Sequence, residues 1–201
     1  EVVRTALDDK EPPPPWVSAS SSGHVAHHPA LSSQLQDAVY RLTRHAGTLT
    51  EDWYLSMRDA TAITHQQWVE VIDVVISVAS VLRFAQLAGI DRPEFPTALD
   101  GEPLRQEQPS KPANHHWVPV VHLEDMTTEL EPFYEGLPVI APVIRALSSV
   151  PAAMDTLSVL SGAQYIPNRE MVDLNWTRGT LSRRQMEFVA GRLSAHRECF
   201  Y

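Results

Sequence analysis

One apolar stretch, residues 65–88, constrains the fold more than any other part of the chain. Thr64 and Gln67 have the spacing of a capping box ahead of it, and Gly89 is a residue type that commonly ends a helix. The Val and Ile content would also suit a strand, but more than twenty residues without a turn signal are too long for one. The pattern therefore predicts one long helix, apolar on most of its circumference, with His65 in its first turn at the surface.

Capping residues and apolar spacing predict further helices on both sides of this stretch. Towards the N-terminus, one helix begins behind Ser32 and another behind Thr50. Towards the C-terminus, Pro151 suits a first helical turn, and Ser182 forms a second capping box with Gln185. The last helix is expected to bury Met186, Val189, Ala190 and Leu193. No stretch alternates convincingly between apolar and polar residues, so the predicted fold class is an all-α helical bundle.

Two proline-rich stretches divide the chain. The first begins at residues 12–15 and continues as a long Ser- and His-containing loop, because consecutive prolines cannot form a regular helix. The second, residues 91–119, has the composition of a linker. The expected organisation is an N-terminal segment over 1–96, a linker over 97–119, and a C-terminal segment over 120–201.

Charge and cysteine content exclude several classes of function. The 201 residues include 16 Lys and Arg against 25 Asp and Glu, and a formal net charge of −9 argues against nucleic acid as a partner. The single cysteine, Cys199, leaves no room for an internal disulfide, a cysteine-rich zinc site or a complete two-cysteine redox motif. No glycine-rich phosphate loop is present in the sequence, so no nucleotide cofactor is expected.

Targeting signals are not apparent in the sequence. The first residues have no basic start followed by an apolar region, which is the pattern of a secretory signal. The long apolar stretch is interrupted by Glu70 and Asp73 and closed by Arg83, short of the ~18 uncharged residues of a membrane helix. A soluble, cytoplasmic protein that contacts no membrane is expected. The chain lacks an initiator Met, and both ends are expected to be internal to a parent sequence.

The sequence LSRRQMEFVAGRLSAHRECFY, residues 181–201, places Glu187 twelve positions before Cys199. This segment resembles the entry to the active site of the alkylhydroperoxidase D-like, or carboxymuconolactone decarboxylase-like, family. In that family a helix bearing a glutamate leads to Cys-x-x-Cys-x-x-x-His, with the glutamate twelve positions before the first cysteine. Residues 32–96 look like the family's stretch after the cysteine motif, and residues 126–167 look like the stretch before it.

The two halves therefore stand in reverse of the family's order, and the second cysteine and the histidine of the motif are absent from the sequence. Joining Tyr201 to Glu1 across a short missing stretch would restore the usual order. Three arrangements fit: a permuted protein, a slice from the middle of a tandem-domain protein, or a chain that lost its motif and whose order was rearranged. The sequence does not choose among them.

The resemblance implies an antioxidant thiol peroxidase that reduces hydroperoxides in the intact parent protein, with no cofactor. Cys199 would be the first cysteine of the centre, and Glu187 the proton relay. Twelve residues of straight helix rise ~18 Å, so the chain has to turn near residues 195–198 for the two to meet. His196 is a candidate to support the thiolate. An outside thiol or dithiol would have to resolve a sulfenic acid, and the family implies a homo-oligomer.

Other interpretations of the same residues stay open. Without the family, a lone cysteine is a small buried hydrophobe, and Glu187 belongs to a solvated helix face, with a raised pKa if it is buried. The chain would then be a catalytically silent scaffold that binds a partner or small ligand. A third alternative is lactone decarboxylation, the chemistry of the family that uses no cysteine pair.

Histidines offer a rival site in the loops. His24, His27 and His28 form one cluster, and His115, His116 and His122 form another. Either cluster could hold zinc if the loops brought three ligands together. Neither has the regular spacing of a zinc motif, so no metal is predicted.

Overall fold

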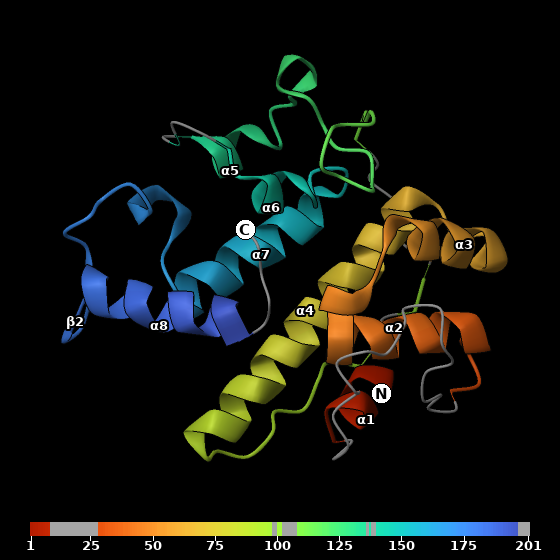
Figure 1. The fold of residues 1–201 in the computed structure, drawn as a ribbon, viewed down its shortest axis with the longest axis horizontal. Helices are drawn as coiled ribbons and strands as arrows, with labels where there is room; N and C mark the ends of the chain where they lie inside the picture. Colours follow the sequence, from red (N-terminus) through yellow and green to blue (C-terminus); the bar gives the residue numbers. More distant parts are fainter. Residues whose placement is uncertain (9–27, 98–99, 102–107, 136, 138–139, 197–201) are drawn as a thin grey trace.

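A computed structural model describes residues 1–8, 28–97, 100–101, 108–135, 137 and 140–196 (Figure 1). Helices supply most of the regular structure in these residues. The named strands are β1 (Thr177–Arg178) and β2 (Leu181–Ser182), which pair antiparallel as a small hairpin. The all-α prediction is confirmed.

The N-terminal helices begin where their capping residues predict. They are α1 (Val2–Asp8), α2 (Ser33–His45), the 3-10 turn η1 (Ala46–Thr48) and α3 (Glu51–Thr61). The Ser32 hydroxyl accepts from the Leu35 N–H at 3.2 Å, and the Thr50 hydroxyl accepts from the Trp53 N–H at 3.2 Å. These caps satisfy N–H groups that a helix start would otherwise leave unpaired.

The apolar stretch forms a single helix, α4 (His65–Ala88), as predicted. The Thr64 N–H donates to Gln67 Oε1 at 2.9 Å, and the Gln67 N–H donates to the Thr64 hydroxyl at 3.1 Å. Gly89 ends the helix in the left-handed conformation with φ of 66°, which costs glycine little because it has no Cβ. α1, α2 and α7 (Pro151–Gln164) pack against α4, which makes it the central helix of the fold (Figure 1).

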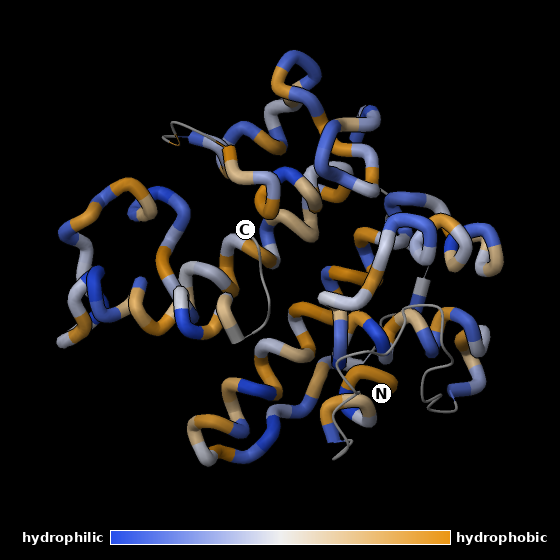
Figure 2. Tube along the Cα trace, viewed as in Figure 1, coloured by the Kyte–Doolittle hydropathy of each residue, from blue (hydrophilic) through white to orange (hydrophobic). Residues whose placement is uncertain are grey.

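α4 is also long and apolar enough, by length and composition alone, to cross a membrane. This differs from the expectation that Glu70 and Asp73 interrupt it too strongly. In the described part of the chain, 17% of its most apolar window is buried, and Figure 2 shows apolar residues along it. The core helix of a soluble protein passes the same test, so this property assigns no place in a membrane.

The C-terminal half consists of shorter elements. They are η2 (Leu123–Asp125), α5 (Glu131–Tyr134), α6 (Pro142–Arg145), α7, η3 (Asn168–Glu170) and α8 (Arg183–His196). Pro151 occupies the first turn of α7 as predicted, where the missing N–H is not needed. The capping box of α8 also forms: the Ser182 N–H donates to Gln185 Oε1 at 2.9 Å, and the Gln185 N–H to the Ser182 hydroxyl at 3.4 Å.

The main core is shared by both halves of the chain. Tyr54 and Trp68 from the N-terminal segment pack in one cluster with Leu130 and Met154 from the C-terminal segment. Val118, near the end of the proline-rich stretch, joins the same cluster and is 8% exposed. The two segments therefore stabilise each other through common apolar burial.

The predicted burial of α8 is largely wrong. Met186 is 7% exposed, but Val189 is 66% and Leu193 59% exposed, and Ala190 is half-buried. Phe188 is likewise 72% exposed. The described neighbours of α8 include the hairpin, the end of α7 and the loop that follows α7, and they leave part of its surface uncovered. An apolar pattern predicts a helix, but which face is covered depends on the elements packed around it.

His65 is not the surface residue expected from its place in the first turn of α4. Its Nδ1 lies 2.6 Å from the Tyr54 hydroxyl, and its Nε2 lies 2.6 Å from an Arg58 guanidinium nitrogen. Because arginine only donates, Nε2 accepts and Nδ1 carries the proton that is donated to the Tyr54 oxygen. Burial, and then the Arg58 charge, lower the pKa of His65 from its ordinary value.

The free energy of unfolding should therefore fall as the pH drops from about 7.5 to about 5.5. Over this range unfolded His65 takes up a proton near its ordinary pKa of 6.5, whereas folded His65 resists protonation. Since the unfolded state binds more protons, stability decreases towards acid pH. Urea unfolding at a series of pH values should give a shallower slope for His65→Gln. The pKa of His45 is also lowered by burial, so His45→Gln should remove a separate part of the slope. An unchanged slope in His65→Gln would contradict the assignment.

Candidate active site around Glu187

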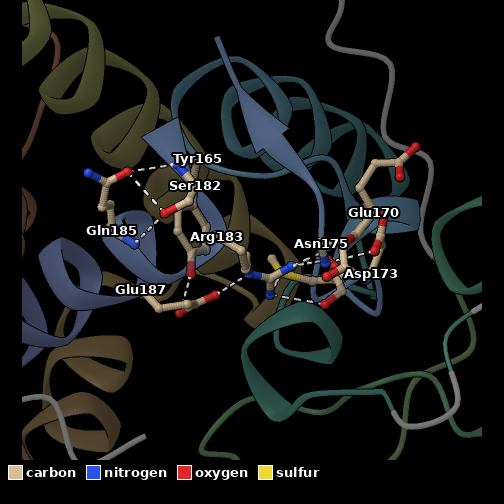
Figure 3. Close-up of polar contacts among 9 residues, drawn as sticks. Tyr165, Glu170, Asp173, Asn175, Ser182, Arg183, Gln185 and Glu187 are labelled. Carbon is tan, nitrogen blue, oxygen red and sulfur yellow. Dashed lines mark hydrogen bonds and ion pairs between the residues drawn. The ribbon is translucent and has the colours of Figure 1, made fainter. Parts of the chain in front are cut away.

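Glu187, the predicted proton relay, lies on α8 with both carboxylate oxygens held by neighbours (Figure 3). Arg183 Nε donates to Oε1 at 2.6 Å. The Tyr165 hydroxyl donates to Oε2 at 2.8 Å. Two donors from different elements therefore fix the direction of the carboxylate, although the side chain is 45% exposed.

Arg183 connects this carboxylate to the loop that follows α7. Its Nη1 donates to the carbonyl of Asp173 at 3.0 Å, and its Nη2 donates to the carbonyl of Met171 at 3.0 Å. The Arg183 side chain is 11% exposed. Arg183 and Glu187 stand one turn apart on α8, so the helix itself brings them together. A nearly buried guanidinium thus ties the loop and Glu187 into one unit (Figure 3).

The electrostatics of the pair favour an ionised carboxylate and a neutral phenol. The Tyr165 hydrogen bond, and then Arg183, hold the pKa of Glu187 below its ordinary value. Burial, and then the hydrogen bond and charge of Glu187, raise the pKa of Tyr165 to about 12. The condition for a raised pKa, burial of Glu187, is not met, because the side chain is 45% exposed and receives two hydrogen bonds.

An apolar cavity of about 480 Å³ lies beside this site, between the end of α7, the hairpin and α8. Its apolar lining includes Met186, Val189 and Leu193. Tyr165 also lines it, so one side chain both borders the cavity and bonds to Glu187. Arg178, which also lines the cavity, fixes the backbone of Tyr165, because its Nη2 donates to the Tyr165 carbonyl at 2.9 Å.

The other predicted site residues lie at or beyond the end of the described chain. Cys199 lies outside the described residues. His196 is the last residue of α8, and its side chain also lies outside the described part. The turn expected within residues 195–198 is not tested, because residues 197–201 lie outside the described part of the chain.

The histidine clusters do not form a metal site in the described part of the chain. His24 and His27 lie outside it. His116 Nε2 lies 3.2 Å from the Pro142 carbonyl, and His122 Nε2 lies 3.1 Å from the Pro112 carbonyl. Among the residues the structure describes, no group of three or more His, Cys, Asp or Glu side chains is placed to hold a metal ion.

Tyr165 and Arg183 were not predicted as site residues from the sequence. Arg183 carried a signal, because a basic and an acidic residue four positions apart on a helix are neighbours. Tyr165 carried none: it lies 22 positions from Glu187, and packing alone brings them together.

No family model, no curated protein and no solved structure matches this chain.

Proposed function

We propose that the parent protein reduces organic hydroperoxides by thiol chemistry at Cys199, with Glu187 as the proton relay. The observation that carries the proposal is the double role of Tyr165, which lines an apolar cavity and donates to the Glu187 carboxylate. In the sequence, Cys199 follows the helix that bears Glu187 by three residues. An oriented carboxylate beside an apolar cavity suits a substrate with an alkyl chain and a reactive polar end.

The chemistry balances with an external thiol as reductant. The Cys199 thiolate attacks the terminal oxygen of the hydroperoxide, the O–O bond breaks, and an alkoxide leaves and is protonated to the alcohol. The cysteine is oxidised to a sulfenic acid. One external thiol condenses with it, which releases water and forms a mixed disulfide, and a second external thiol releases Cys199 as the reduced form.

Glu187 is suited to the proton transfers in this sequence. Tyr165 and Arg183 keep it a carboxylate at neutral pH, so it holds the thiol proton only transiently and passes it to the leaving alkoxide. Tyr165 keeps its own proton because its pKa is raised to about 12, and it therefore orients the carboxylate as a donor. The proposal includes a homo-oligomer in the cytoplasm, an external thiol or dithiol, and no bound cofactor.

Cys199→Ser should abolish the consumption of tert-butyl hydroperoxide by the 201-residue chain in the presence of dithiothreitol. Serine is not nucleophilic enough at neutral pH to break the O–O bond. Because Cys199 is the single cysteine, a dimedone adduct on the intact protein would report its sulfenic acid without ambiguity. Arg192→Gln, an exposed change on the same helix, is the matched control and should keep wild-type activity.

Two results would overturn the proposal. If the wild-type chain consumes no hydroperoxide and gives no dimedone adduct, a catalytically silent scaffold is favoured. If Cys199→Ser remains active, the reaction does not use the thiol, and an assay for lactone decarboxylation becomes the appropriate next measurement.

A further inference from the structure

A second cavity, of about 440 Å³, lies between α1, α2 and α4 and shares no lining residue with the cavity beside Glu187. Its floor is a stripe of valines on α4: Val71, Val74, Val75 and Val78. Side chains of α1 and α2 form its walls, and they are also aliphatic. A volume in this range is typical of small-molecule sites.

The α4 side of the cavity is elongated, and its lining changes from polar to apolar residues along the helix. The lining positions on α4 run from Gln67 to Val78, which at the rise of an α-helix is roughly 16 Å, about the length of an extended alkyl chain of ten to twelve carbons. Gln67 and Glu70 lie at one end of this stripe, and valines continue to the other end. The shape fits a single aliphatic chain with one polar head.

The wall opposite α4 is held in place by a buried glutamine. Gln36 is 2% exposed, and its Oε1 accepts from the His28 N–H at 2.8 Å. Its Nε2 donates to the carbonyls of Leu31 at 2.8 Å and His28 at 3.0 Å. Since His28 and Leu31 both line the cavity, this wall is fixed before any ligand arrives, which lowers the entropy cost of binding.

The charges on the lining select the head group. Glu70 and Glu1 contribute two carboxylates, against the single α-ammonium group of Glu1 and the imidazole of His28, and no Lys or Arg is among the described residues that line the cavity. A carboxylate at a partly apolar mouth attracts a cation and repels an anion. Glu70 is exposed, so an ammonium group could reach it without leaving water completely.

We propose that this cavity binds a single-chain aliphatic amine, with the alkyl chain along the valine stripe and the ammonium group at Glu70. The proposal does not depend on the peroxidase function, because it uses none of the residues around Glu187.

The test compares three probes of equal chain length on the 201-residue chain: n-decylamine, n-decanol and decanoate, each below its micelle concentration. Titration calorimetry should show saturable binding of decylamine, weaker binding of decanol and the weakest binding of decanoate. Glu70→Gln should lower the affinity for decylamine roughly 2- to 5-fold, as expected for the loss of an exposed ion pair. The affinity for decanol, which carries no charge, should stay the same. Glu94→Gln, an exposed carboxylate that does not line the cavity, is the matched control.

A second variant tests the position of the alkyl chain. Val74 is 58% exposed, so the larger side chain of Val74→Phe can fill the cavity without disturbing the core. This variant should bind all three probes more weakly. The proposal is overturned if decanoate binds as tightly as decylamine, if Glu70→Gln leaves decylamine unchanged, or if no probe binds saturably.

Discussion

Replacing Tyr54 with alanine should lower the free energy of unfolding by about 3–5 kcal/mol. The ring is fully buried and packs against Trp68 at 5.8 Å and Trp117 at 6.5 Å between ring centroids. Its hydroxyl also accepts from His65. Truncation would therefore leave a cavity in the main core and remove the acceptor for the partly buried His65 donor. Urea unfolding followed by circular dichroism measures the change.

Tyr54→Phe separates the two contributions. It keeps the ring packing and should cost only about 1–2 kcal/mol, because His65 loses its acceptor. Leu55→Ala is the matched control on the same helix, since Leu55 is 38% exposed and its truncation should cost much less. Equal losses for Tyr54→Ala and Tyr54→Phe would show that the ring does not pack as described.

Glu187→Gln should lower the proposed hydroperoxide-reducing kcat by about 10²- to 10⁴-fold, the usual contribution of a positioned acid–base group. Glutamine retains an oxygen that can accept from Tyr165 but cannot take up a proton. Steady-state consumption of tert-butyl hydroperoxide measures the loss, with Arg192→Gln as the control on the same helix. An unchanged kcat in Glu187→Gln would show that Glu187 is not the proton relay. The role of Cys199 would not be affected by that result, because Cys199→Ser tests it separately.

Tyr165→Phe tests the role of Glu187 in a second way, through a shift of the pH–rate profile that a general loss of structure would not produce. Without the phenol donor the pKa of Glu187 should rise, because a hydrogen bond to the carboxylate stabilises its ionised form. The acid limb of the pH–rate profile should therefore move to higher pH, with the limiting rate less affected than in Glu187→Gln. A profile unchanged in position would show that the limb does not report Glu187.

The helices were predictable because their signals are local. The capping boxes of Thr64 with Gln67 and of Ser182 with Gln185 form as expected, since each involves contacts three residues apart. Gly89 ends α4 for an equally local reason, the freedom of glycine at positive φ. The candidate site was predictable only in part: the sequence identified Glu187, but not the donors that orient it.

The sequence by itself determined that the fold is all-α, where α2, α3, α4, α7 and α8 begin, and that residues 65–88 form one long apolar helix that ends at Gly89. That this helix lies at the centre of the fold was decided by packing. The tertiary structure alone decided the surroundings of individual side chains. It placed Tyr165 on Glu187 across 22 positions, buried part of His65 between Tyr54 and Arg58, and left Val189 and Leu193 of α8 exposed. The physical reason is the distance in sequence over which each effect acts. Helix caps and apolar periodicity involve residues within one or two helical turns, whereas the burial and the pKa of a side chain depend on residues that only tertiary packing brings close to it.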